Sequence, residues 1–504
     1  MSSNRKRFFY NGILLTAVAL AVRSVGMLFN SYITRTVGAE GIGLFTLIMT
    51  VYSFAVTFAT SGISLTVTRL VAGAVGEGDG KGVRRIMRHA ITYALIFSIT
   101  ASVVLLVFAE YFGIRVLGDG RTILPLRILA VSLVPIALST VFSGYFVGVK
   151  RVARNAAVQV CGQIFKIAIT LFFVLRFARL GVEYATIALC ISTTLTELAA
   201  FLVGLLQFLL DRRRKPNGDK NTPRRFSDVT SMALPLALSA YIRSALLTLE
   251  HILIPKRLRD RGESHTDSLA QYGILHGMAL PLLMYPMSPL SSFAGLLVPE
   301  FAESTVRGEQ ARMKRIADEA LNTTLTYSAL VAVLLGIFSE EIGYVLYDSY
   351  DTGYYIALMA PIIPIMYLDH VTDSILKGIG EHVYSMWVNI CDSVLSVVLV
   401  WSLIPLMGIA GYAVVIIVME GFNFTLSALR LRKRIKFKIN LFTAFVLPTL
   451  AATASALITR RLFTFSGNGA TATWLVLKLV FAVCAFFAVY IPLSKIGKSR
   501  KITV

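Results

Sequence analysis

Apolar segments of about 20 residues recur along almost the whole of this 504-residue chain. A helix of that length crosses the hydrocarbon core of a bilayer and satisfies its own backbone hydrogen bonds there. Hydrophobic residues make up 56% of the chain and charged residues only 15%, which leaves too little polar surface for a soluble domain. We therefore predict an all-α polytopic membrane protein with fourteen transmembrane helices. The predicted spans lie at 9–33, 43–67, 90–111, 124–148, 155–177, 183–210, 229–254, 271–298, 319–339, 354–376, 384–406, 409–429, 441–459 and 471–493.

The distribution of basic residues predicts the orientation of these spans. If the chain starts in the cytoplasm and its spans alternate, 32 of the 49 Lys and Arg fall in cytoplasmic segments and 12 on the other side. By the positive-inside rule, this bias places both termini in the cytoplasm. The net charge of +21 is then explained by the membrane topology and does not indicate a nucleic-acid partner. A cleaved signal peptide starting at Arg5-Lys6-Arg7 is the alternative, and the repeat described next disfavours it because it needs this segment as a span.

Two parts of the chain match at a constant offset of 230 residues. The matching pairs are Gly43 and Gly273, Ala72 and Ala302, Gly78 and Gly308, Arg85 and Arg315, Gly148 and Gly378, and Cys161 and Cys391. The offset equals six spans, so both copies cross the membrane in the same direction around a shared central cleft. We predict two pseudo-symmetric six-helix lobes and two further C-terminal helices. The predicted parts are an N-lobe at 1–210, a basic cytoplasmic linker at 211–228, a C-lobe at 229–430, and a two-helix appendix with its tail at 431–504.

An arginine followed by a serine lies near the middle of the first span of each lobe, as Arg23-Ser24 and Arg243-Ser244. A central Arg costs about 2.5–3.5 kcal/mol on insertion, so we expect both guanidinium groups to face the cleft and bind an anion. Their planar fork suits phosphate oxygens. Arg69, late in the second span, is a third candidate, although snorkelling to the cytoplasmic surface explains it equally well.

Acidic residues in the spans supply candidate partners and ion-coupling groups. Glu250 follows Arg243 by seven residues and is expected on the same helical face. The ion-coupling candidates are Asp369, His370, Asp373, Asp392, Glu197 and Glu420. Two carboxylates spaced like Asp369 and Asp373 repel each other at low dielectric, which favours a shared proton or a bound cation. The alternative is that they lie in a hydrated cytoplasmic mouth beside Lys377.

The sequence contains none of the HExxH, GxSxG or CxxC patterns of metal, hydrolase or redox sites. We therefore expect no enzyme activity and no cofactor. Proline clusters at 281–299 and 361–364 predict bent helices, which suit a cleft that opens alternately to each side.

One stretch, TRTVGAEGIGLFTLIMTVYSFAVTFATSGISLTVTRLVA at 34–72, carries a resemblance to a known family. Its most specific positions are Gly38, Glu40, Gly41, Gly43, Leu44 and Phe45, followed by 61–64 and 68–72. With the basic amino terminus and the 6+6+2 helices, this stretch resembles the stage V sporulation protein B family of bacterial polysaccharide-biosynthesis membrane proteins. That family belongs to the multidrug/oligosaccharidyl-lipid/polysaccharide exporter superfamily and is similar to the lipid II flippases.

The resemblance implies a flippase that moves an undecaprenyl-diphosphate-linked saccharide, lipid II-like or another cell-envelope precursor, from the inner to the outer leaflet of the bacterial cytoplasmic membrane. Arg23 and Arg69 occupy places comparable to cleft arginines of lipid II flippases. The helix-eight arginine of those flippases has no match within 271–298, and Arg243 is its candidate replacement. The segment 441–493 would form a groove for the lipid tail, where Lys478 would meet a diphosphate or snorkel.

Alternatives remain at this stage. A drug/cation antiporter of the same superfamily would centre its cleft on carboxylates, and a membrane enzyme or scaffold of cell-envelope assembly belongs to a different class. The implied partners are the lipid-linked saccharide, membrane lipids and cell-wall synthesis proteins in peptidoglycan assembly or sporulation. H⁺, Na⁺ or the membrane potential would drive the cycle.

Overall fold

The computed structural model describes residues 3–149, 151–212, 225–463 and 472–499, and every regular element in these ranges is a helix. The side chains of residues 3–24, 152–157, 159, 212 and 494–499 are outside this description. By their internal contacts the residues form two compact units. We call Thr36–Gly273 the 36–273 unit, and we call Ile274–Val504 together with Met1–Arg35 the 274–504 unit.

The described helices include 12 stretches that are long and apolar enough to cross a membrane, or 13 if the bent pair Gly120–Ala130 and Leu133–Gly148 is one span. The polytopic all-α prediction is therefore confirmed. The count of fourteen stays a prediction, because the single stretch Val25–Gly76 includes parts of two predicted spans.

Helix α1 (Ser3–Thr60) is broken at Gly38, whose φ of 80° and ψ of 167° are open to glycine but strained for other residues. The boundary between the units, after Arg35, falls beside this break. Gly38, the first glycine of the stretch that resembles the family, thus lies where one helical segment ends and the next begins.

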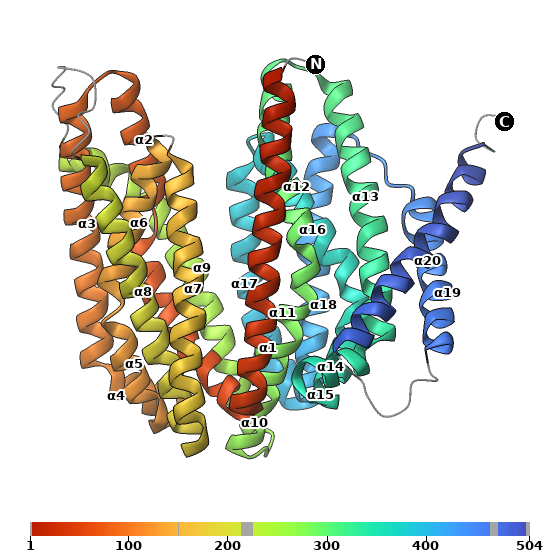
Figure 1. Cartoon of the computed structure of the whole chain (residues 1–504), viewed down its shortest axis with the longest axis horizontal. Helices are drawn as coiled ribbons and strands as arrows, with labels where there is room; N and C mark the ends of the chain where they lie inside the picture. The colour runs from red at the N-terminus through yellow and green to blue at the C-terminus, as the bar shows by residue number, and fades with distance from the viewer. Residues whose placement is uncertain (1–2, 150, 213–224, 464–471, 500–504) are drawn as a thin grey trace. The chain divides into compact units, whose positions relative to one another are not determined.

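The 36–273 unit consists of the second segment of α1 and the helices that follow it as far as residue 273 (Figure 1). These helices are α2 (Ile63–Gly76), α3 (Gly80–Val107), α4 (Ala109–Tyr111), η1 (Phe112–Leu117), η2 (Gly120–Thr122), α5 (Ile123–Ala130), α6 (Leu133–Gly148), α7 (Val152–Phe177), η3 (Ala178–Leu180), α8 (Val182–Arg212), α9 (Phe226–Asp260) and α10 (His265–Tyr272). Gly144 and Gly148 let α6 approach α2 closely, because a Cβ at either position would press against an α2 carbonyl oxygen.

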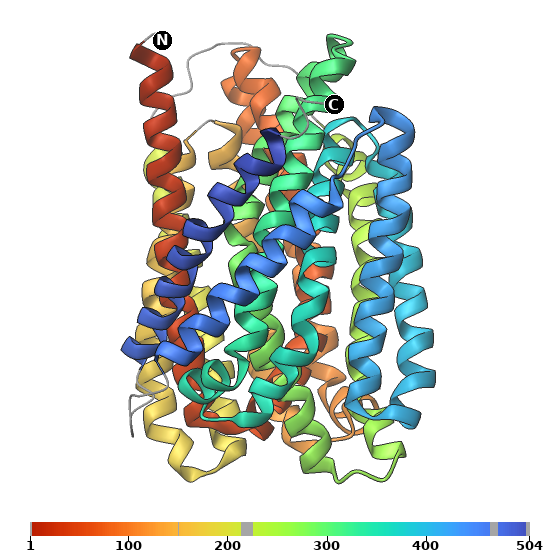
Figure 2. The same cartoon turned by 90° about the vertical axis from the view of Figure 1, so that its right-hand side faces the viewer.

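The 274–504 unit contains the remaining helices. They are η4 (Gly273–Ala279), which begins at the last residue of the other unit, α11 (Leu280–Met284), η5 (Tyr285–Met287), α12 (Ser288–Val306), α13 (Gln310–Ile337), α14 (Ser339–Tyr347), α15 (Tyr350–Met359), η6 (Ala360–Ile362), α16 (Ile363–Gly378), α17 (His382–Met407), α18 (Ile409–Ile435), η7 (Phe442–Val446), α19 (Leu447–Leu462) and α20 (Ala472–Ser499). Phe301, Leu321 and Val371 belong to a core that joins α12, α13, α16 and α18. The predicted two-helix appendix is α19 and α20, which pack together as an inclined pair (Figure 2) and contact α13 and α14.

Some helix bounds follow the 230-residue offset of the predicted repeat, while the two six-helix lobes stay a prediction. Helices α3 and α13 both have 28 residues and start 230 residues apart, and α6 and α16 both have 16 residues at the same offset. Gly78 and Gly308, before α3 and α13, have φ angles of 72° and 68°. A glycine in this left-handed conformation forms the same tight turn in each unit.

The boundaries of the units do not coincide with the predicted lobe boundaries at 210 and 229. Helix α9, predicted to open the C-lobe, packs against α2 and α3 in the 36–273 unit. Residues 1–35, predicted to open the N-lobe, belong to the 274–504 unit. Arg35 fixes them there by donating from Nη2 to the carbonyl oxygens of Tyr344 and Val345 at 2.9 and 2.5 Å, at the C-terminal end of α14. Most of the predicted linker 211–228 lies outside the described residues.

A charged network ties the loops at one end of the 36–273 unit together. Arg121 forms ion pairs with Glu40 and Asp119 at 2.9 and 2.8 Å. His265 Nδ1 lies 2.9 Å from a guanidinium nitrogen of Arg259, which can only donate, so Nδ1 accepts and Nε2–H donates to Asp119 at 2.8 Å. Burial by itself raises the pKa of Asp119, but the hydrogen bonds from Arg121 and His265 outweigh it and hold that pKa below its usual value.

Candidate functional site

A polar cavity of about 590 Å³ lies between α1 and α9 in the 36–273 unit. Its walls are the segment of α1 after the break at Gly38 and the middle of α9, both within candidate membrane spans. The lining residues are Thr46, Met49, Thr50, Ser53, Thr57, Ser61, Ala240, Arg243, Ser244, Leu247, Thr248 and His251. Polar groups within a membrane span are costly, so this cavity is the leading candidate site.

Hydroxyl groups line the α1 wall because they recur at helical spacing. Thr46, Thr50, Ser53 and Thr57 are separated by four, three and four residues, which places them on one helical face. Their own protons are used within the helix: Thr46 donates to Ile42 O at 2.7 Å, Thr50 to Thr46 O at 2.9 Å, and Thr57 to Ser53 O at 2.8 Å. The hydroxyl oxygens keep lone pairs that can accept from a ligand. Our sequence analysis missed this stripe, although its spacing is readable from the sequence.

Arg243 supplies the positive charge of the cavity. Its side chain is exposed, lines the cavity and forms no ion pair with any described side chain. Ser244, the next residue, is half-buried and lines the same wall. A guanidinium at membrane depth needs water or an anion as its partner, and its planar donors match phosphate oxygens bidentately. Arg243 and Ser244 therefore line the same cavity, together with the hydroxyl groups of α1.

The neighbouring acid has a different environment. Glu250, predicted on the Arg243 face, is only 7% exposed and is not among the lining residues. The next residue, His251, lines the cavity, and its Nδ1 lies 2.9 Å from the Tyr272 hydroxyl. His251 follows Ser244 by seven residues, so the helical spacing that placed Ser244 could have indicated it.

The other predicted cations are placed elsewhere. Arg69 is exposed on α2, outside the cavity lining, and forms no ion pair with any described side chain. Arg23 and Ser24 lie outside the described side chains. Lys478 of the appendix pairs with Glu341 of α14 at 3.0 Å, so its charge is balanced within the 274–504 unit.

Acidic side chains from three helices gather in the 274–504 unit. Asp369 of α16, Asp392 of α17 and Glu420 of α18 lie within electrostatic range of one another. Asp373 also lies within electrostatic range of Asp369, but it pairs with Lys377, at 2.5 Å, and accepts a hydrogen bond from Ser385. His370 is half-buried on α16 directly after Asp369, and the hydroxyl of Ser374, the residue after Asp373, donates to the His370 carbonyl oxygen at 3.0 Å.

The remaining predicted acid, Glu197, lies in the 36–273 unit. It is half-buried on α8, within electrostatic range of Lys166 and Tyr52. The Tyr52 hydroxyl lies 2.5 Å from the Ser132 hydroxyl. Within the described ranges, no group of three or more His, Cys, Asp or Glu is arranged to hold a metal ion.

Comparison with known proteins identifies relatives across most of the chain. A model of the family described as polysaccharide biosynthesis protein matches residues 8–305, and a MatE model matches residues 265–402. The chain is 26% identical over 420 residues to Stage V sporulation protein B of Bacillus subtilis (strain 168), covering 82% of this chain and 81% of that protein. It is 23% identical over 427 residues to Lipid II flippase MurJ of the same organism, covering 79% and 77%.

Solved structures share the fold. Lipid II flippase MurJ in an inward closed conformation matches with a TM-score of 0.70 and 12% identity, covering 97% of this chain and all (100%) of that one. An inward-facing multidrug resistance MATE family transporter of the MOP superfamily matches with a TM-score of 0.70 and 17% identity, covering 83% and 94%. These two solved structures are a flippase and a transporter. Because the polysaccharide biosynthesis model matches more than half of the chain, and the relatives agree with it, this chain belongs to the polysaccharide biosynthesis protein family.

Proposed function

We propose that this protein is a flippase that moves an undecaprenyl-diphosphate-linked saccharide from the inner to the outer leaflet by alternating access. The observation that carries the proposal is the Arg243 guanidinium, which faces a hydroxyl-lined cavity at membrane depth and has no ion pair with a described side chain.

The two parts of such a headgroup match the two kinds of group in the cavity. A diphosphate offers acceptor oxygens to the guanidinium, whose charge lowers the cost of bringing phosphate into a low-dielectric region. Saccharide hydroxyl groups donate hydrogen bonds, and the oxygens of Thr46, Thr50 and Ser53 are placed to accept them. The similarity to Lipid II flippase MurJ supports this substrate class.

The acidic cluster supports an ion-coupled cycle. Asp369, Asp392 and Glu420 lie close together within membrane-spanning helices, where mutual repulsion favours uptake of H⁺ or Na⁺. We assign them to coupling, and we keep a drug/cation antiporter as the second candidate because the same cluster would suit a cationic substrate. Arg23, Ser24, Arg69 and Glu250 remain proposed substrate-site residues on the evidence of the sequence.

We place the protein in the bacterial cytoplasmic membrane with both termini in the cytoplasm, where its lipid-linked substrate is made and cell-wall synthesis proteins are its proposed partners. Cysteine-accessibility labelling of residues 5 and 498 in intact cells and in inverted vesicles tests this orientation. Labelling of either residue in intact cells by an impermeant reagent would contradict it.

Translocation of a fluorescent lipid-linked saccharide in proteoliposomes tests the substrate and the role of Arg243. Replacement Arg243→Ala removes a charge-assisted contact worth about 1.5–3 kcal/mol, so the rate at low substrate should fall on the order of ten- to a hundredfold. Arg243→Lys should retain part of the rate, and Arg176→Ala, an exposed arginine on α7, should keep all of it.

Other results of this translocation assay would indicate a different class of protein. A chemically altered lipid would indicate a membrane enzyme, whereas folded protein without any transport would indicate a scaffold. Export of an organic cation with an unchanged rate in Arg243→Ala would favour the antiporter.

A further inference from the structure

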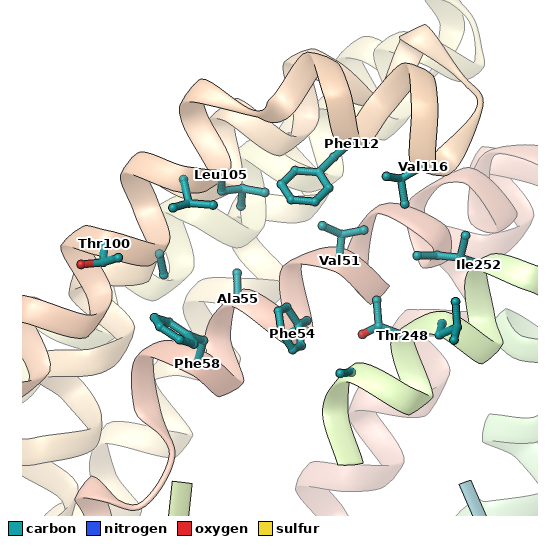
Figure 3. A pocket seen from close by; sticks show the side chains of 14 residues that line it. Val51, Phe54, Ala55, Phe58, Thr100, Leu105, Phe112, Val116, Thr248 and Ile252 are labelled. Atoms are coloured by element: carbon teal, nitrogen blue, oxygen red, sulfur yellow. The ribbon is translucent and has the colours of Figure 1, made fainter. Parts of the chain in front are cut away.

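A second cavity, of about 490 Å³, lies on another face of the α1–α9 pair in the 36–273 unit (Figure 3). Its walls come from α1, α3, η1 and α9, and Figure 3 shows Phe54, Phe58, Leu105, Phe112 and Val116 around the opening. Thr248 lines both this cavity and the polar one, so α9 separates two cavities of opposite character.

The cavity offers a ligand only hydrocarbon. No charged side chain lines it, and its two threonine hydroxyls are already engaged: Thr100 donates to Ile96 O at 2.8 Å and Thr248 to Thr50 O at 3.4 Å. Water would find no hydrogen-bond partner there, while an empty space of this size forgoes dispersion contacts along its walls. Its volume falls within the range of about 300–1,000 Å³ that ligand pockets occupy.

The mouth of the cavity continues onto a lipid-type surface. Val104 and Leu249 line the cavity and remain 41% and 45% exposed. Along α3, the large apolar side chains of Ile96, Ile99 and Val103 are also exposed. This stretch of α3 is a candidate membrane span, so the neighbouring medium is bilayer hydrocarbon, and a lipid chain can enter from the side.

An exposed arginine lies beside the lining residues of η1 in the sequence. Arg115 lies on η1 between the lining residues Phe112 and Val116, is exposed, and forms no ion pair with any described side chain. It stands where α3 has ended, close to the predicted outer surface. A phosphate headgroup at that depth would place its acyl chain alongside the cavity.

The transported lipid itself is a poor occupant, because the α1–α9 pair is closed between the two cavities. Tyr241 donates to Phe58 O at 3.0 Å, and Thr248 donates to Thr50 O at 3.4 Å. A lipid whose headgroup sits at Arg243 would have to break these contacts to pass its tail between the helices into the apolar cavity.

We propose that this cavity binds one acyl chain of an anionic phospholipid whose phosphate lies at Arg115. The bound chain fills the space behind α9 and holds α9 against α1. It is a lipid site separate from the proposed transport site, and it does not depend on which substrate is carried.

Native mass spectrometry of the purified full-length chain, titrated with phosphatidylglycerol, tests the site. Two neighbouring valines of α3 give a matched pair of variants: Val104 lines the cavity, whereas Val103 is exposed outside it. We expect one tightly held phosphatidylglycerol per chain in the wild type and in Val103→Phe, and at least tenfold weaker binding in Val104→Phe.

Arg115→Gln tests the headgroup without filling the cavity. It should abolish the preference for phosphatidylglycerol over phosphatidylcholine while a chain still binds. Equal phosphatidylglycerol affinity in Val104→Phe and Val103→Phe would overturn the proposal, and so would a preference unchanged by Arg115→Gln. Displacement of the bound phospholipid by a polyisoprenyl diphosphate would assign the cavity to the carried lipid instead and would also overturn it. Since the assay measures phospholipid binding, its failure leaves the translocation test of Arg243 unaffected.

Discussion

Two charged residues in membrane helices have opposite environments here. Arg243 faces a polar cavity and pairs with no described carboxylate, whereas Asp373 is neutralised by Lys377 one turn away. An ion pair within one helix neutralises both charges, so no ligand is needed to account for Asp373 in a membrane helix. A charge without a partner requires water or a ligand, which is why Arg243 carries the functional proposal.

The lowered pKa of Asp119, at one end of the 36–273 unit, predicts that the stability of the protein depends on pH. Its pKa is held below the usual value in the folded protein, so it stabilises the fold above its unfolded pKa of about 3.9. That contribution is lost as the pH falls through the lower, folded pKa. In thermal unfolding at pH 7, Asp119→Asn should cost about 1–3 kcal/mol by leaving Arg121 and His265 without their acceptor.

The difference between wild type and Asp119→Asn should shrink once the pH drops below about 4. Asp351→Asn, an exposed acid on α15, is the control and should unfold like the wild type at every pH. A constant difference between pH 7 and pH 3 would show that the Asp119 charge does not contribute as described.

At the scale of elements, a helix break and a close helix crossing explain two glycines of the stretch that resembles the family. Gly38 breaks α1, and Gly43 lets the next turns of α1 cross α10 with backbone against backbone. A Cβ on Gly43 would overlap the Leu269 carbonyl oxygen, and a Cβ on Gly273 would overlap that of Ala39. Residues 39 and 43 and residues 269 and 273 are repeat partners, so the crossing is symmetric.

This crossing predicts that Gly43→Ala destabilises the 36–273 unit. The added methyl group must push two backbones apart, at a cost of about 1–3 kcal/mol, measured by thermal or denaturant unfolding in detergent. Gly73→Ala on α2 is the matched control, since a Cβ there meets nothing within 4 Å. We expect that control to be neutral or more stable, by up to about 1 kcal/mol. Equal stability of the two variants would contradict the close crossing.

The sequence was sufficient for the all-helical polytopic fold and for the helix pairs at the 230-residue offset, because bilayer thickness fixes helix length and the glycine turns recur at that offset. It did not reveal the short helices α4, η1 and α14, which follow directly on longer helices without a proline between them. It also did not reveal that α9 packs on α2 and α3, since such packing depends on side-chain shape rather than periodicity. The hydroxyl stripe from Thr46 to Thr57 was readable, but serine and threonine are common in membrane helices and carry little signal alone.

For the whole molecule, the acidic cluster predicts how transport is driven. If Asp369, Asp392 and Glu420 take up the coupling ion, the variants Asp392→Asn and Glu420→Gln should lose on the order of tenfold of the gradient-stimulated rate. Their rate without a gradient should change little. Proteoliposomes with an imposed pH or Na⁺ gradient measure this ratio directly, with Asp351→Asn as the control. Full stimulation in both variants would exclude the cluster from coupling.

The central claim is that the cavity at Arg243 holds the phosphate end of a lipid-linked saccharide. Mass spectrometry of lipids that co-purify with the protein tests it most directly, with wild type, Arg243→Ala and Arg176→Ala prepared in parallel. The account predicts a polyisoprenyl-diphosphate saccharide with the wild type and with Arg176→Ala, and its loss of about tenfold or more with Arg243→Ala. The same lipid at equal occupancy in all three preparations would contradict the account.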